Sequence, residues 1–198
     1  MAELLILLPA AGASARMRGR DKLLEPVDGV ALLRRQAMAA LATGAPVLVT
    51  LPRGAGTARA SALAGLAARI AWIDAAEGMA ASLRAGAAAA QAAGASGLMV
   101  MLPDMPEITT EDLAMLRAAF HAAPDHALRA CTSGGAAGHP VIFPSRLFAM
   151  LARVQGDAGG RAVLAGEAVQ LLPLSGERAL TDLDTPEDWA DWRARTGR

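Results

Sequence analysis

The chain alternates between short apolar runs and longer stretches in which apolar residues recur at helical spacing. In the first 123 residues, the runs that predict buried strands are 4–8, 46–51, 70–73 and 97–102. The stretches between them predict helices over 30–43, 57–69, 78–93 and 109–123. This alternation indicates βαβ units, and therefore an α/β fold with a mostly parallel sheet and helices on both of its faces.

The pattern changes after residue 124. Short strands are expected at 127–132, 140–143 and 169–172, with short helices at 145–154 and 159–164. A final helix over 186–195 begins with a proline, which suits the first turn. No stretch is long enough to be an interdomain linker, so we expect a single domain over residues 1–198.

Composition narrows the functional classes. The formal net charge is +0 and aromatic residues make up 3%, which disfavours nucleic acid or an acidic membrane as a partner. Cys131 is the one cysteine, so an internal disulfide is impossible and a reducing cytoplasm is the expected location. Residues 85–102 carry no charge, but alanine and glycine dominate their first half, so we interpret them as a helix, a turn and a strand.

The loop after the first strand is the most informative segment. In open α/β sheets, ligands bind beyond the carboxyl ends of the strands, which directs attention to residues 9–22 and 103–108. Residues 9–14 are small and let backbone N–H groups approach a phosphate closely. The spacing is that of neither a P-loop nor a dinucleotide fingerprint. The alternative is a tight turn followed by a solvated basic face.

A cluster of cations follows these small residues, formed by Arg16, Arg18, Arg20 and Lys22. Lys22 precedes two leucines whose packing would hold it near a triphosphate. We favour Arg16 and Lys22 as functional and expect Arg18 and Arg20 to be exposed.

Acidic residues occur at two further places. Asp104 directly follows the strand 97–102, flanked by prolines that restrict the backbone, and it suits a Mg²⁺ ligand. A turn aspartate bonded to its own backbone is the alternative. Thr185 is a good helix cap, but capping does not explain Asp182 or Asp184. Either one is a candidate second metal ligand.

Three weaker signals complete the candidate residues. Ser82 and Gly86 share one helix face, which suits either a flat base or a close helix–sheet contact. His139, at a strand start, is either an acid/base or substrate contact or a structural residue. Asp157 is interpreted first as a cap for the helix at 159 and second as a contact to the acceptor substrate.

Taken in order, these segments resemble the MobA/MocA-like NTP transferase family, most closely its molybdenum cofactor cytidylyltransferase branch. The motifs that carry the resemblance are residues 9–17, 21–24, 82–86, 102–106, 138–140, 156–157 and 182–188. Each motif is weak alone, but the ordered set spans nearly the whole chain.

The resemblance implies a three-layer αβα, Rossmann-like fold of the nucleotide-diphospho-sugar transferase type. It also implies Mg²⁺-dependent transfer of CMP from CTP to the phosphate of molybdopterin, with release of pyrophosphate. Residues 1–123 would form the nucleotide-binding half and residues 124–198 the acceptor-binding half. A recipient molybdoenzyme or its chaperone would be a further partner, with no nucleic acid and no membrane involved.

The resemblance also assigns roles to individual residues. The expected nucleotide contacts are Ala10, Ala11, Gly12, Ala13, Ser14, Lys22, Ser82 and Gly86. The expected catalytic residues are Arg16, Lys22 and Asp104. Asp104 would bind Mg²⁺ with Asp184 as the preferred second ligand, and His139 and Asp157 would contact the acceptor.

The sequence departs from the family pattern at two positions. Arg18 lengthens the segment between Met17 and Lys22, and Pro103 stands before Asp104 where glycine is usual. The Ala-Ala-Gly form of residues 10–12 favours CTP over GTP. The alternatives that stay open are a GTP-using guanylyltransferase, transfer to a sugar phosphate or methylerythritol phosphate, and a nucleotide-binding accessory protein without transferase activity.

Overall fold

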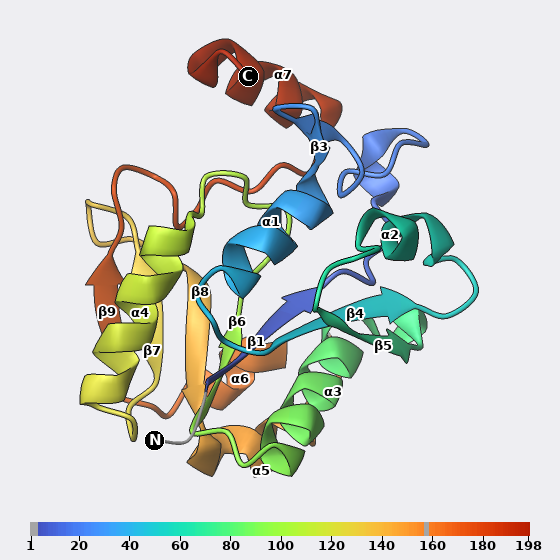
Figure 1. Ribbon diagram of the computed structural model, residues 1–198. Coiled ribbons are helices and arrows are strands. Elements are labelled where there is room, and N and C mark those ends of the chain that lie inside the picture. Colours follow the sequence, from blue (N-terminus) through green and yellow to red (C-terminus); the bar gives the residue numbers. More distant parts are fainter. Residues whose placement is uncertain (1–3, 157–158) are drawn as a thin grey trace.

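A sheet of seven strands forms the centre of the protein in the computed structural model, which describes residues 4–156 and 159–198 (Figure 1). In spatial order the strands are β5 (Arg69–Ile73), β4 (Val47–Pro52), β1 (Leu4–Pro9), β6 (Gly97–Val100), β8 (Ala137–Pro144), β7 (Leu128–Cys131) and β9 (Gln170–Pro173). The first four are parallel, whereas β8 runs antiparallel to both β6 and β7.

Helices cover both faces of this sheet (Figure 1). One face carries α1 (Leu32–Leu41), α2 (Thr57–Ala62) and α4 (Thr110–Ala122), and the other carries α3 (Gly78–Ala92), α5 (Phe148–Leu151) and α6 (Gly159–Leu164). Strand β1 is buried on both sides: Ile6 packs toward α1 and α4, and Leu7 packs toward α3. The three-layer α/β fold expected from the alternation of runs is therefore confirmed.

Several expected elements differ from the structure, among them the helix expected over 145–154, which is a 3-10 turn over Ser145–Leu147 followed by α5. The helix expected over 57–69 ends at Ala62, because the chain then turns and Gly65 adopts a φ of +79°. The strand expected over 140–143 extends over Ala137–Pro144, since β8 pairs with a neighbour on each side. The helix expected from residue 30 begins at Leu32.

A small hairpin explains that last difference. Strands β2 (Pro26–Val27) and β3 (Val30–Ala31) pair across Asp28 and Gly29, which have φ values of +51° and +78°. An Asp-Gly pair with two positive φ angles is a strong signal for a two-residue hairpin turn. The Asp28-Gly29 pair is therefore the local sequence feature that predicts this hairpin.

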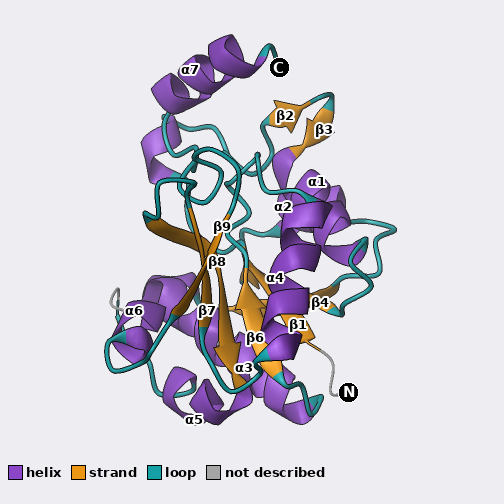
Figure 2. Cartoon of the chain, turned by 90° about the vertical axis from the view of Figure 1, so that its left-hand side faces the viewer, coloured by secondary structure: helices purple, strands orange, loops and turns teal. Residues whose placement is uncertain are grey.

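The C-terminal helix α7 (Pro186–Thr196) stands apart from the sheet (Figure 2). Thr185 caps it, and Asp188 completes a capping box, as a Thr cap before Pro186 predicts. Its Trp189 and Trp192 pack in a separate cluster with Met17, next to the hairpin. This packing brings the segment before α7 against the loop that follows β1.

Short 3-10 turns complete the secondary structure: η1 (Ala15–Met17), η2 (Ala75–Glu77) and η3 (Ser145–Leu147). Within the described residues, no helix combines the length and apolar character needed to cross a membrane. Residues 85–102 form the end of α3, a turn and β6, as expected.

Candidate active site

Three side chains that are distant in sequence meet at the carboxyl ends of the central strands. The Nζ atom of Lys22 donates to the Asp104 carboxylate, and it lies 2.6 Å from Oδ1 of Asp184. Lys22 follows β1, Asp104 follows β6, and Asp184 precedes α7. The side chains are 15%, 14% and 20% exposed, so the ammonium group lies between two carboxylates in a partly buried position.

Burial and charge act in opposite directions on Lys22. Burial by itself lowers the pKa of Lys22, but the charges and hydrogen bonds of Asp104 and Asp184 raise it above its usual value. Burial raises the pKa of Asp182, and the negative charges of Asp104 and Asp184 raise it further. The lysine therefore stays protonated and compensates part of the charge of a group of carboxylates.

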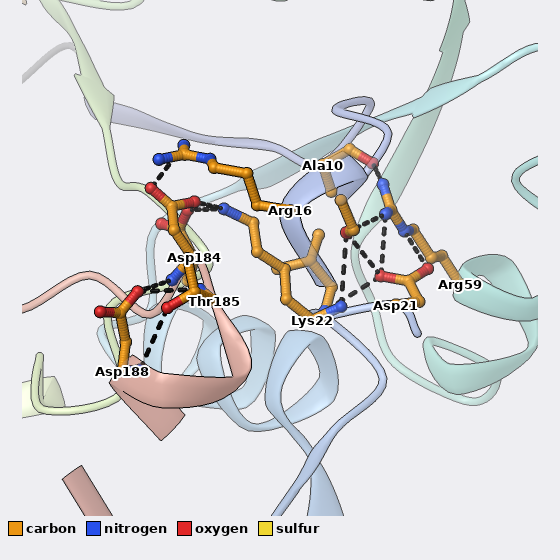
Figure 3. A network of polar contacts seen from close by, with 11 residues as sticks. Ala10, Arg16, Asp21, Lys22, Arg59, Asp184, Thr185 and Asp188 are labelled. Carbon is orange, nitrogen blue, oxygen red and sulfur yellow. Dashed lines mark hydrogen bonds and ion pairs between the residues drawn. The ribbon is translucent and has the colours of Figure 1, made fainter. Parts of the chain in front are cut away.

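The basic residues of the first loop separate into two kinds. Arg16 donates from Nη2 to Oδ2 of Asp184 at 2.7 Å, so it joins the Lys22 group (Figure 3). Arg18 pairs with Glu187 at 2.6 Å on the surface. Arg20 pairs with a glutamate of the same loop region at 3.3 Å and is half exposed. Arg16 is itself 69% exposed, so what sets it apart from Arg18 and Arg20 is its pairing with Asp184, and the functional role expected for Arg16 and Lys22 stays a prediction.

A divalent cation suits the two carboxylates. Oδ1 of Asp104 is buried and has no hydrogen-bond partner among the described residues, which leaves a negatively charged oxygen unsatisfied. The described chain holds no group of three or more metal-binding side chains. A metal here would therefore take one or two carboxylates from the protein and its other ligands from substrate phosphate and water, as Mg²⁺ commonly does.

The small-residue loop is exposed at its centre and buried at its start. Gly12 has no atom within 4 Å of the place where a side chain would begin, and Gly12 and Ala13 are exposed. Ala10 is fully buried, its N–H donates to the Thr50 carbonyl at 3.0 Å, and its carbonyl accepts from Arg59 at 2.6 Å. Both backbone groups of Ala10 are therefore bonded within the protein, and Ala10 is left out of the nucleotide site proposed below.

Arg59 is a residue that the sequence reasoning missed. It lies on α2 and forms two hydrogen bonds to the Asp21 carboxylate, at 2.7 and 2.8 Å. It also donates to the Ser14 hydroxyl at 3.1 Å. Burial would raise the pKa of Asp21, but Arg59 holds it below its usual value. No sequence motif marks Arg59, because an isolated arginine in a short helix is typical of a surface position.

A first cavity of about 170 Å³ opens between this loop and the start of α3. Its lining includes Ala11, Gly12, Lys22, Asp104, Gly78 and Ser82. The hydroxyl of Ser82 accepts a hydrogen bond from Thr50 at 2.9 Å and the residue is almost completely buried. Ser82 therefore lies in the cavity wall, and its hydroxyl is already bonded within the protein.

Gly86 has a different position from the one expected for a nucleotide contact. A Cβ atom on Gly86 would lie 2.6 Å from Cδ2 of Leu7, so the glycine allows α3 to pack closely on β1. It is not among the residues that line the first cavity. The close helix–sheet contact that was the alternative interpretation explains this glycine, and Gly86 is left out of the nucleotide site proposed below.

A second cavity of about 250 Å³ adjoins the first, and Met79 and Leu102 line both. Its polar residues are Arg129, His139 and Arg161, and the rest of its wall is largely apolar. Burial, assisted by the charge of Arg129, lowers the pKa of His139 to about 4, so the imidazole is neutral near pH 7. Asp157, the other expected acceptor contact, lies outside the described residues.

The fold and this group of residues define the class of protein. A mostly parallel α/β sheet that gathers a small-residue loop, a lysine and aspartates at its carboxyl edge is typical of Rossmann-like nucleotidyltransferases. Residues 6–173 match the family model for the MobA-like NTP transferase domain, and the chain belongs to that family.

Solved structures and a curated relative agree with this family. Rv0371c from Mycobacterium tuberculosis H37Rv is 28% identical, with a TM-score of 0.82 over 96% of this chain and 97% of that one. A structure of Rv0371c in complex with manganese is 26% identical, with a TM-score of 0.76 and the same coverage. The purine catabolism protein PucB of Bacillus subtilis (strain 168) is 31% identical over 119 residues, which is 59% of this chain. This chain spans only 56% of the length of PucB.

Proposed function

We propose that this nucleotidyltransferase transfers CMP from CTP to the phosphate of a molybdopterin-type acceptor and releases pyrophosphate. One observation carries the nucleotidyl-transfer part: Lys22 lies between Asp104 and Asp184 at the edge of a cavity that the small-residue loop borders. A fixed cation beside paired carboxylates suits a site for a triphosphate and a divalent cation.

The nucleotide belongs in the first cavity. We place its phosphates against Ala11 and Gly12, which line this cavity, and beside the exposed Ala13, with Lys22 and Arg16 neutralising charge on the leaving pyrophosphate. Ser82 lies in the wall near the base. The preference for CTP depends on the Ala-Ala-Gly form of residues 10–12, so it is the part of the proposal that a nucleotide panel tests first.

The metal belongs on Asp104 and Asp184. The unsatisfied oxygen of Asp104 and the manganese complex of Rv0371c both support a divalent cation, and we take Mg²⁺ as the physiological one. Asp184 is preferred to Asp182 because it is Asp184 that shares the lysine with Asp104. When bound, the metal would polarise the α-phosphate and orient the leaving group.

The acceptor belongs in the second cavity. Arg129 and Arg161 suit a phosphate, and the apolar wall suits the ring system of a pterin-like molecule. The two cavities share Met79 and Leu102, so an acceptor in one lies next to a nucleotide in the other. An acceptor phosphate is already ionised near neutral pH, so alignment and charge neutralisation supply the rate and a general base is not needed.

Pyrophosphate release tests this function directly. The purified protein is incubated with Mg²⁺ and each of the four NTPs, with and without molybdopterin. We expect release with CTP and molybdopterin together, and a product in which CMP is joined to the acceptor. Release with GTP would make the protein a guanylyltransferase, and release only with a sugar phosphate or methylerythritol phosphate would replace the acceptor. Nucleotide binding without release under any condition would favour an accessory protein.

A further inference from the structure

Helix α2 buries one residue, and that residue is charged. Of the residues of Thr57–Ala62, Arg59 is the buried one, with a side chain 6% exposed. Burying a guanidinium group is costly unless every donor is paired, so a helix of small and polar residues has no packing reason to place an arginine inward. The partners of Arg59 therefore indicate what this helix contributes.

Every side-chain partner of Arg59 among the described residues lies on the loop after β1. Nη1 donates to the Ala10 carbonyl at the start of the loop, and Nε and Nη2 bind the Asp21 carboxylate at its end. Nη2 also reaches Ser14 in the middle, at 3.1 Å. One side chain therefore joins the two ends and the centre of a segment that is largely exposed, as Figure 3 shows for Ala10, Asp21 and Arg59.

The loop conformation needs such a restraint. Ser14 has a φ of +51° and a ψ of +34°, a left-handed conformation that is unfavourable for a residue with a side chain. Its hydroxyl is held by Arg59 and Asp21, and the backbone N–H of Lys22 donates to the same hydroxyl at 3.3 Å. The N–H of Leu23 donates to Asp21 at 3.0 Å. The backbone on both sides of Lys22 is thereby fixed.

We propose that Arg59 is a positioning residue for nucleotide binding: with Asp21 and Ser14 it fixes the loop that presents Ala11–Ala13 and Lys22 to the triphosphate. Arg59 lines neither cavity, so it acts through the loop and not by touching the substrate. The inference rests on the proposed function for the identity of the ligand, and on the hydrogen bonds alone for the restraint of the loop.

The chain offers matched variants. R59M leaves the Asp21 carboxylate half-buried without its cation and is expected to lower stability by itself. The double variant R59M/D21N removes both charges, so it regains most of the melting temperature but not the restraint. R59K keeps the charge but cannot form the two-pronged contact to Asp21. Arg34 donates to the carbonyls of Ala62 and Ala64 at 2.9 Å each, so R34M loosens the end of α2 without touching the loop.

Two readouts separate this inference from the proposed function. The first is limited trypsin cleavage after Arg16, Arg18 and Arg20 in the nucleotide-free protein, followed by mass spectrometry. We expect cleavage in R59M/D21N to be about tenfold faster than in the wild type and in R34M. The second is the affinity for MgCTP by calorimetry, which we expect to fall about tenfold or more in R59M/D21N and in R59K, and to stay unchanged in R34M.

The outcomes lead to different conclusions. If R59M/D21N cleaves and binds like the wild type, or if R34M changes both readouts as much, Arg59 is not a positioning residue. If the wild type binds no nucleoside triphosphate while R59M/D21N is cleaved faster, the restraint of the loop is supported and the proposed function is what fails.

Discussion

The two adjoining cavities differ in how they are built. The first is bordered by charged residues that are already paired within the protein, as Lys22 is with Asp104 and Asp184. In the second, Arg129 is bonded to the Gly138 carbonyl, but the exposed Arg161 has no hydrogen bond or ion pair to any residue in the described ranges, and the rest of the wall is largely apolar. A network of paired charges suits one constant ligand, such as a metal triphosphate. In a largely apolar cavity, where Arg161 has no partner among the described residues, shape decides which ligand binds, and we therefore expect the second cavity to determine substrate specificity.

We expect the largest loss of activity from a substitution of Asp104, the proposed metal ligand in the wall of the first cavity. D104N removes a negative charge from the proposed metal site but keeps the shape of the side chain, so we expect Mg²⁺-dependent pyrophosphate release to fall by about a hundredfold or more. The melting temperature should change little. D191N, an exposed substitution on α7, is the control and should retain full activity. Near-normal turnover in D104N would remove Asp104 from the metal site.

We expect a substitution of Lys22 to change the affinity for the nucleotide and the affinity for the metal in opposite directions. K22M removes a charged donor to the phosphates, and we expect the affinity for MgCTP to fall by about tenfold to a hundredfold in calorimetry. Binding of Mn²⁺ to the nucleotide-free protein should become tighter, because the ammonium group no longer compensates Asp104 and Asp184. R18M breaks a surface pair and serves as the control. Weaker Mn²⁺ binding in K22M would contradict this division of roles.

Arg161 tests the second cavity. R161M should raise the KM for the phosphorylated acceptor about tenfold and leave the affinity for CTP unchanged. Because Arg161 has no internal partner in the described residues, its removal should cost little stability, and the melting temperature serves as the control. An unchanged KM would place the acceptor elsewhere.

The smallest expected effect comes from His139, and it concerns how the stability of the fold depends on pH. Its folded pKa of about 4 lies below the ordinary value of 6.5, so the unfolded chain binds the proton more readily between these values. Stability should therefore decrease as the pH falls, by ~1 kcal/mol between pH 7 and pH 5.5. H139Q should remove this contribution, whereas H121Q on α4 should keep it. Unfolding by urea at the two pH values measures the difference, and equal pH dependence in all three proteins would show that His139 is not held neutral.

Much of the first cavity was predictable from the sequence. The apolar run of β6 ends just before Asp104, and small residues followed by Lys22 directly follow β1, so local order was enough to place both on one sheet edge. The choice between Asp182 and Asp184 was open, because it depends on how α7 packs through Trp189 and Trp192. Contacts between residues so far apart in the sequence leave no pattern in the residues next to Asp182 and Asp184.

Two other residues, Arg59 and Gly86, could not be assigned a role from the local sequence either. The role of Arg59 can be recognised only from its partners Ala10, Ser14 and Asp21. The composition of α2 does not predict these contacts. Gly86 carried two interpretations, a base contact or a packing contact, and only the position of Leu7 decided between them. In each case the deciding residue lies on another element.

The central claim is that the nucleotide occupies the first cavity and not the second, and one calorimetric comparison tests it most directly. MgCTP is titrated into the wild type, K22M and R161M under the same conditions. The account predicts equal affinity for the wild type and R161M, with a loss of about tenfold or more in K22M alone. A loss in R161M as large as that in K22M would place the nucleotide in the second cavity and contradict the account.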